Sequence, residues 1–371
     1  MTQADAQERL GRLLGYLEHD PGNTALLRDA AAAALDADDP QTAKELFARL
    51  RDAGGLTEAD GNLWAIAAVR SGEPEAAAET FAGLLQHNPG DPAVRFNLAW
   101  ALALAKDTAG AREVLDEATV EALPQAAALE VRLMHAAGEF EQAAERAKAH
   151  LARHGDYPPL CAALSVLALD LEDEALARRC AEQAAGHPDA LTTLAMLALG
   201  EHEEDRARGM FESALALDPQ SPRAWIGLGL AELERGESAL AAGHLDRGAE
   251  LFGNHLGSWI AVGWAWLLAG DRAKARERFE RAVALDGNFA EAQGSLAVVE
   301  LLEGDREAAE RRVEVASRLD RQSFSAAFAR ILLSAASGDT ATAQRIADMA
   351  LRQPIGPDGR TIADAIARMA R

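Results

Sequence analysis

An alanine recurs along the chain at a nearly constant interval, and this interval limits the possible folds more than any other feature of the sequence. The spacings between successive alanines are 34, 34, 32, 32, 32, 34, 34, 34 and 34 residues. A repeat of this length is typical of helical hairpins stacked in a solenoid, where each hairpin buries its apolar face only against its neighbours. The alanines are Ala43, Ala77, Ala111, Ala143, Ala175, Ala207, Ala241, Ala275, Ala309 and Ala343.

The residues around each alanine predict a pair of helices joined by a tight turn. A large apolar residue often follows four positions later and would fill the space beside the alanine: Phe47, Phe81, Leu115, Phe211, Leu245, Phe279 and Val313. In six of the ten units a glycine that could end the first helix lies five positions before it: Gly72, Gly138, Gly236, Gly270, Gly304 and Gly338. The rest of the chain is rich in alanine and leucine and poor in strand formers, which predicts an all-α protein.

One unit carries the fullest form of this pattern: Trp259, Gly263, Trp266, Gly270, Ala275, Phe279 and Ala282. On these residues the chain resembles the tetratricopeptide repeat (TPR) family. The resemblance implies a right-handed α-α superhelix, a solenoid of about ten TPR helical hairpins with terminal capping helices. The units are expected to start near residues 24, 58, 92, 124, 156, 188, 222, 256, 290 and 324.

The pattern divides the chain into five stretches. Residues 1–23 are expected to form an N-terminal capping helix, a degenerate repeat, and residues 356–371 a C-terminal capping helix. TPR repeats 1–3 fill residues 24–123, and TPR repeats 6–10 fill residues 188–355. Residues 124–187 are predicted to hold two irregular units, as a functional joint or through neutral drift; in the second, a register through Leu176, Cys180 and Ala184 is an alternative to Ala175.

The sequence contains no catalytic motif, and we expect neither an enzyme nor a bound cofactor or metal. His150 and His154 lie one helical turn apart, but no third ligand accompanies them. The charged run from Glu201 to Asp205 is expected in a solvated turn. Cys161 and Cys180 lie among apolar residues and are expected to be buried small hydrophobic side chains.

In the TPR family, the first helices line the concave face of the superhelix, so the resemblance implies where a partner would bind. The fifth, sixth and ninth places of the units give the candidate partner-binding residues Phe96, Asn97, Trp100, Met196, Ile226, Leu230, Ile260 and Trp264. Gly294 and Val298 continue the same rows, and Glu234 and Glu291 would add negative charge to the groove. For Trp100 and Trp264 the alternative is that each packs in the core between adjacent units.

Charge limits the class of partner. The formal net charge is −22, and residues 1–221 hold 38 acidic against 18 basic side chains, whereas residues 222–371 hold 21 against 19. Such a surface repels phosphate backbones, so nucleic acid is not an expected partner. The acidity favours a protein or peptide partner that is apolar or amphipathic with basic character; the alternative is that it only keeps the solenoid soluble. Membrane insertion is not expected, because the longest apolar stretch, Trp259–Gly270, is too short to span a bilayer.

These features predict a non-catalytic scaffold or adaptor that holds a partner segment in a concave groove. The alternative is a chaperone-like accessory or assembly factor for a secretion, envelope or multi-subunit complex. The arginine-rich, lysine-poor composition favours a bacterial protein. We expect it in the cytoplasm because the first residues lack the apolar core of a signal peptide; removal of such a peptide would make it periplasmic.

Overall fold

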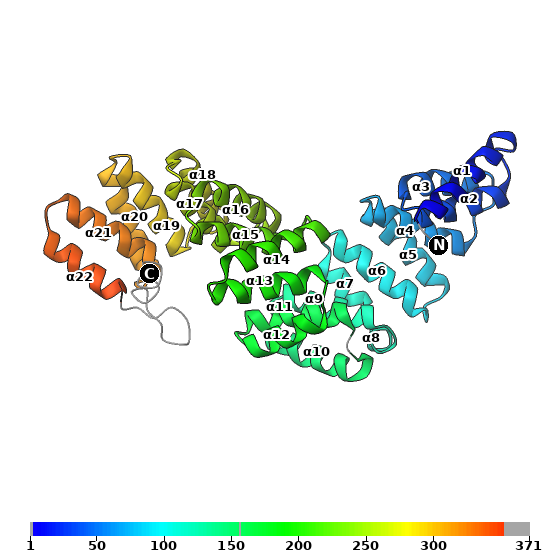
Figure 1. Ribbon diagram of the computed structural model, residues 1–371, viewed down its shortest axis with the longest axis horizontal. Coiled ribbons are helices and arrows are strands. Elements are labelled where there is room, and N and C mark those ends of the chain that lie inside the picture. Colours follow the sequence, from blue (N-terminus) through cyan, green and yellow to red (C-terminus); the bar gives the residue numbers. More distant parts are fainter. Residues whose placement is uncertain (1–2, 156, 352–371) are drawn as a thin grey trace. The chain divides into compact units, whose positions relative to one another are not determined.

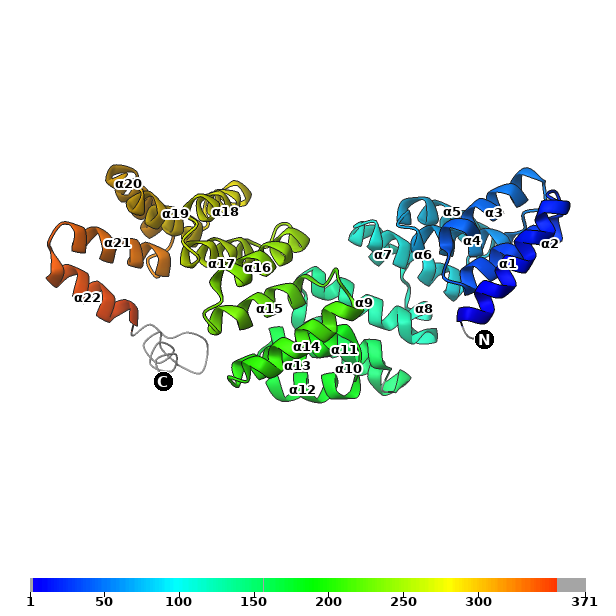
Figure 2. The ribbon, with the colours of Figure 1, turned by 45° about the horizontal axis from the view of Figure 1, so that its top comes forward.

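The computed structural model describes residues 3–155 and 157–351, except for the side chains of residues 348–351, and every regular element in this part of the chain is a helix (Figures 1 and 2). The chain divides into two compact units, residues 1–184 and residues 185–371, which we call unit 1 and unit 2. Each is a stack of paired helices, which confirms the predicted all-α solenoid. The expected C-terminal capping helix, residues 356–371, lies outside the described residues.

Unit 1 contains five hairpins and two additional helices. Its first helices are α2 (Thr24–Asp36), α4 (Glu58–Arg70), α6 (Pro92–Leu104), α9 (Pro124–Ala136) and α11 (Pro158–Asp170). Their second helices are α3 (Pro40–Asp52), α5 (Pro74–His87), α7 (Thr108–Val114), α10 (Phe140–His154) and α12 (Glu174–Gln183). Helix α1 (Gln3–His19) precedes them and buries Ala6, Leu10 and Leu17 in the first core cluster, and α8 (Glu117–Ala122) lies between α7 and α9.

The described part of unit 2 contains five further hairpins. The first helices are α13 (Pro188–Gly200), α15 (Pro222–Glu234), α17 (Leu256–Leu268), α19 (Ala290–Leu302) and α21 (Phe324–Ala336). The second helices are α14 (Glu204–Leu217), α16 (Ser238–Phe252), α18 (Arg272–Leu285), α20 (Arg306–Leu319) and α22 (Thr340–Leu351).

The two helices of a hairpin differ in how strictly their length is fixed. Each of the ten first helices has 13 residues. The second helices have between 7 and 15 residues. Variation in repeat length is therefore taken up by the second helices, and the places along each first helix remain equivalent from hairpin to hairpin.

The recurring alanine is the fourth residue of each second helix and is buried in every hairpin, with one correction to its position. Ala175 is exposed, and Ala177 is the buried alanine of the fifth hairpin. The prediction of Ala175 as the buried alanine is therefore wrong by two residues. The alternative register required Cys180 and Ala184 to be buried, and both are. With Ala177 in place, the interval after Ala143 is 34 residues and the next is 30, because α12 is shortened to 10 residues.

The turn inside each hairpin has the same left-handed backbone in all ten cases. The residue five positions before the buried alanine has φ between 59° and 91°. Six of these residues are the predicted glycines, and the other four are Asp38, Lys106, Glu172 and His202. The residue after each donates its N–H to the carbonyl five positions earlier, as Asp271 does to Trp266 at 2.9 Å, which is the hydrogen bond of a Schellman motif. The four non-glycine residues therefore accept a conformation that costs about 1–2 kcal/mol each.

An acidic residue precedes every second helix at the N-cap position, but aspartate and glutamate act differently there. The described aspartates, such as Asp305, accept the backbone N–H of the residue three positions later, here Ala308 at 3.0 Å. Glu73, Glu139 and Glu237 make no such cap. Their longer side chains bind cations instead; Glu139, for example, pairs with Arg112 at 2.9 Å.

The second helix of the third hairpin is interrupted, which the sequence did not predict. Helix α7 ends at Val114, Leu115 adopts an extended backbone, and α8 begins after Asp116. The interval from Ala111 to Ala143 is 32 residues, so an unbroken helix through residue 121 would leave only two residues before Pro124. The break lets the chain turn back earlier and removes this conflict.

The break is stabilised by charge. A hydrogen bond from Thr119 and the positive charge of Arg95, 3.1 Å away, hold the pKa of Asp116 below its usual value despite partial burial.

Close packing inside the hairpins explains several glycines in the first helices. A Cβ atom on Gly263 would lie 2.2 Å from Cε1 of Phe279, whose side chain is fully buried, and a Cβ on Gly227 would lie 2.2 Å from the ring of Phe211. These first-helix glycines therefore make room for the large side chain of the second helix, a pairing that the sequence pattern did not specify.

Candidate partner-binding surface

The eight candidate partner-binding residues lie on four first helices, and all are half-buried. The structure divides them between the two units: Phe96, Asn97 and Trp100 lie on α6 in unit 1, and Met196, Ile226, Leu230, Ile260 and Trp264 lie on α13, α15 and α17 in unit 2. Each unit therefore has its own set of candidate residues, and their role in binding stays a prediction.

In unit 1 the candidate surface is aromatic with one amide. The rings of Phe96 and Trp100 stack with centroids 6.4 Å apart and planes inclined by 26°. Both rings pack against a small core cluster that contains Leu129 and Leu133 of α9. Asn97 beside them is half-buried, and within the described residues its amide makes no hydrogen bond to the protein. This arrangement combines a rigid apolar platform with an open donor and acceptor.

In unit 2 the candidate surface is almost entirely apolar. Met196 and Leu230 pack on the core around Phe211, and Ile226 and Ile260 pack on the core around Val262. Trp264 contacts Phe279 of α18 and Phe328 of α21 edge-on, with centroid distances of 5.8 and 5.9 Å. Trp264 thus contacts aromatic rings of two other helices, whereas Trp100 stacks on Phe96 of its own helix.

The indole N–H groups distinguish the tryptophans further. Trp225 and Trp259 each donate to a backbone carbonyl, and Trp266 donates to Asp246 at 2.9 Å. Across the described ranges, the N–H of neither Trp100 nor Trp264 has a protein acceptor. The same is true of Trp64, which packs between two core clusters. Trp100 and Trp264 therefore combine a half-buried apolar ring with a donor open to a ligand.

Two expected members of the groove are closed off by packing between α19 and α21. Gly294 and Val298 are buried, and a Cβ on Gly294 would lie 2.5 Å from the amide nitrogen of Ala326. Glu291 is also occupied, because its carboxylate accepts the N–H groups of Phe324 and Ser325 at 2.7 and 3.0 Å. The expectation of an open groove at these residues is therefore wrong, since the first helix of the last hairpin covers them.

Glu234, which was expected to add negative charge to the groove, belongs to a small group of possible cation ligands. Ligand atoms of His202, Glu204 and Glu234 lie within 4.8 Å of one another. Burial and the charge of Glu204 raise the pKa of Glu234, while the charge of His202 opposes the shift. Since His202 and Glu234 are exposed, the geometry alone assigns no ion to the group.

His150 and His154 hold helices together. Nε2 of the buried His150 lies 2.6 Å from a carboxylate oxygen of Glu130, and Nε2 of His154 lies 2.8 Å from the carbonyl oxygen of Val120 in α8. Burial raises the pKa of Glu130, but hydrogen bonds with His150 and Arg146 outweigh it and keep that pKa below its usual value. The two histidines thus fasten α8 and α9 to α10.

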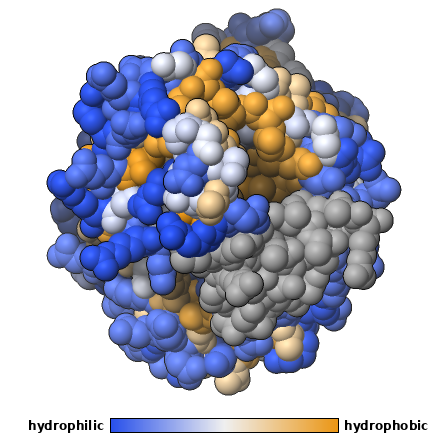
Figure 3. Space-filling model, turned by 90° about the vertical axis from the view of Figure 1, so that its left-hand side faces the viewer, coloured by the Kyte–Doolittle hydropathy of each residue, from blue (hydrophilic) through white to orange (hydrophobic). Residues whose placement is uncertain are grey.

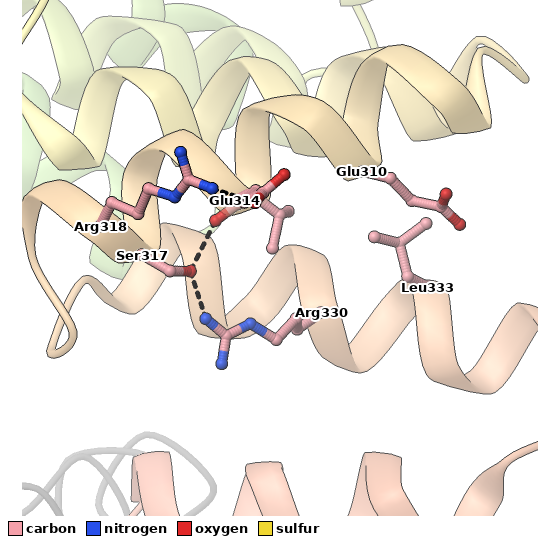
Figure 4. A pocket seen from close by; sticks show the side chains of 7 residues that line it. Glu310, Glu314, Ser317, Arg318, Arg330 and Leu333 are labelled. Atoms are coloured by element: carbon pink, nitrogen blue, oxygen red, sulfur yellow. Dashed lines mark hydrogen bonds and ion pairs between the residues drawn. The ribbon is translucent and has the colours of Figure 1, made fainter.

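The sequence did not predict one surface feature, a cleft near the end of the described chain. A cleft of about 420 Å³ separates α20 from α21 and is lined by Glu310, Val313, Glu314, Ser317, Arg318, Arg330 and Leu333 (Figure 4). Apolar side chains also gather in a hollow bordered by hydrophilic residues when the molecule is seen from the side of the C-terminal hairpins (Figure 3). The glycine at position 294, where other first helices carry larger residues, is the only sequence signal that bears on the cleft.

No described helix is both long enough and apolar enough to cross a membrane. A family model described as a tetratricopeptide repeat matches residues 68–133, and a second with the same description matches residues 192–254. One match lies in unit 1 and the other in unit 2. Among curated proteins, none matches the chain.

Several solved structures resemble the chain in fold. The structure described as MamA protein is 19% identical with a TM-score of 0.38, and the alignment covers 45% of this chain and 94% of that one. The Cut9–Hcn1 hetero-tetramer of APC/C is 14% identical with a TM-score of 0.42, over 89% of this chain and 86% of that one.

Proposed function

Because this chain is a tetratricopeptide-repeat protein, we propose that it is a non-catalytic scaffold that holds a segment of a partner protein on its first helices. The observation that carries the proposal is the pair of half-buried tryptophans, Trp100 and Trp264, whose indole N–H groups have no acceptor in the described part of the chain. Each lies at the ninth place of a first helix beside other half-buried apolar side chains. A large ring with a free donor is typical of the residues that anchor a partner.

The two surfaces suit different parts of a partner. The platform of Phe96, Asn97 and Trp100 offers an amide to a peptide backbone and aromatic rings to an apolar side chain. The apolar surface on α15 and α17 suits one face of an amphipathic segment. Basic character in the partner is favoured at unit 1, since residues 1–184 carry 31 acidic against 16 basic side chains.

The experiment is affinity capture from the lysate of the native host, followed by mass spectrometry, with wild-type protein and single variants. Trp100→Ala should reduce recovery of the partner by about tenfold, as for loss of a central aromatic anchor. Leu240→Ser is a matched control, because this leucine is 51% exposed on the second helix α16. Its recovery of the partner should equal that of wild type.

Thermal unfolding of the same variants separates binding from stability. If Trp100→Ala recovers less partner only to the extent that its melting temperature is lowered, Trp100 is a core residue and the proposed surface is wrong. If wild-type protein and the Leu240→Ser variant recover no specific protein, the scaffold function itself is wrong.

The alternative function is that of a chaperone-like accessory or assembly factor. It would use the same surfaces, but the captured proteins would be the unassembled subunits of one complex. Capture before and after assembly of that complex distinguishes the two functions.

A further inference from the structure

The cleft between α20 and α21 has an apolar floor and results from the way α21 is attached. Val313 and Leu333, which line it, are 6% and 8% exposed. The start of α21 is fixed to α19, because Gly294 allows backbone contact and the hydroxyls of Ser295 and Ser325 are hydrogen-bonded at 3.0 Å. Helix α21 therefore follows α19, and a gap remains on the side that faces α20.

The two acidic residues of the cleft are already neutralised. Glu314 pairs with Arg318 at 2.5 Å, and Glu310 pairs with Arg306 at 2.8 Å. Both pairs lie along α20 itself, so neither carboxylate compensates a charge on α21.

Arg330 on α21 supplies an unpaired positive charge. Its guanidinium donates to the hydroxyl of Ser317, which in turn donates to the carbonyl oxygen of Val313 at 2.5 Å (Figure 4). Among the described residues no carboxylate pairs with Arg330. A guanidinium has five N–H donors in a planar fork that matches a carboxylate, and here most of those donors are open. Figure 4 shows this group at one end of the cleft and Leu333 farther along it.

We propose that this cleft binds a short acidic–aliphatic segment of a partner protein, with an aliphatic side chain on Val313 and Leu333 and a neighbouring glutamate or aspartate carboxylate on Arg330. Charge complementarity favours this occupant, because the only uncompensated charge among the lining side chains is positive. The cleft also lies in the part of the chain that is close to neutral, with 21 acidic and 19 basic side chains in residues 222–371, so an acidic segment meets little repulsion. This site would give the proposed scaffold an additional contact with a partner, and neither Trp100 nor Trp264 takes part in it.

The test uses the full chain and a fluorescein-labelled, acetylated and amidated peptide with Leu-Glu-Leu between Gly-Ser flanks. Fluorescence anisotropy should show saturable binding that weakens with salt, and the same peptide with Gln in place of Glu should bind about tenfold more weakly. Arg330→Gln should weaken the Glu peptide to the level of the Gln peptide. Arg311→Gln is the matched control, because this arginine is exposed on α20 outside the cleft and loses the same charge.

Three results would overturn the proposal: no saturable binding of the Glu peptide, equal affinity for the Glu and Gln peptides, or unchanged affinity in Arg330→Gln. A second variant, Val313→Thr, keeps the shape of the floor and should weaken both peptides, and melting curves verify that each variant is folded. Trp100→Ala should leave the affinity for this peptide unchanged, so failure of the cleft and failure of the proposed tryptophan surface are distinguishable.

Discussion

The packing of Gly263 against Phe279 makes the sharpest prediction about how the hairpins are held together. In the substitution Gly263→Ala, the new Cβ would lie 2.2, 2.5 and 2.7 Å from three atoms of the Phe279 ring. Carbon atoms in contact are normally about 3.5–4.0 Å apart, so the ring or the helix must move by more than about 1 Å. The ring is fully buried in a close-packed cluster, so little space is available for that movement.

The expected free-energy change follows from two opposing effects. Overpacking a core typically costs about 1–3 kcal/mol, and contact with three ring atoms favours the upper end. Replacing glycine by alanine inside a helix gains about 1 kcal/mol. Gly263→Ala should therefore lower the free energy of unfolding by about 2 kcal/mol. The same substitution at Gly243, which is exposed in α16 with no atom within 4 Å of the added Cβ, should raise it by up to about 1 kcal/mol.

The assay is urea unfolding followed by circular dichroism, combined with hydrogen exchange of the α17 and α18 amides, because a solenoid need not unfold in one step. Phe279→Leu should relieve the clash, so the double variant with Gly263→Ala should lose at least about 1 kcal/mol less than the sum of the single variants. If Gly263→Ala is as stable as Gly243→Ala, the ring moves freely and the reasoning about close packing is refuted.

Three further predictions concern turns, caps and a buried charge. Lys106→Gly should stabilise unit 1 by about 0.5–1 kcal/mol in urea unfolding, because the left-handed turn no longer holds a side chain, although glycine loses more backbone entropy on folding. Asp305→Glu should destabilise unit 2 by about 0.5–1 kcal/mol, because the longer side chain loses the cap on Ala308; unchanged hydrogen exchange at the start of α20 would contradict this. Burial raises the pKa of Asp60, but hydrogen bonds from Arg28 and Thr57 outweigh it and hold that pKa below its usual value. The stability from this carboxylate is therefore present above about pH 4 and lost as the pH falls through the lowered pKa, and Asp60→Asn should cost about 1–3 kcal/mol at pH 7 and flatten the urea–pH profile in acid.

Local spacing predicted the hairpins well because each one is specified by residues close in sequence. The glycine, alanine and large side chain of a hairpin lie within ten residues, so their pattern can be read without knowing the rest of the fold. The same pattern also requires a left-handed turn where no glycine is present, as at Glu172 and His202. There the tertiary packing of the two helices overrides the local preference of the side chain.

The sequence could not predict features that depend on how one hairpin meets the next. Ala175 and Ala177 fit the local pattern almost equally, and only the shortened helix α12 decides between them. The burial of Gly294 and Val298 likewise depends on α21, which begins about 30 residues later. The prediction that these positions line an open groove therefore failed where two first helices, α19 and α21, approach each other closely.

The constant length of the first helices has a consequence for insertions and deletions. An extra residue inside a first helix would rotate every later side chain of that helix by about 100° and would turn its partner-facing residues into the core. Residues missing from a repeat are taken up by the second helix and its connections, as the 10-residue α12 illustrates. Engineered insertions, such as a fluorophore site or an affinity tag, should therefore be tolerated in the connections that follow the second helices, while the rows of binding side chains stay in phase from one hairpin to the next.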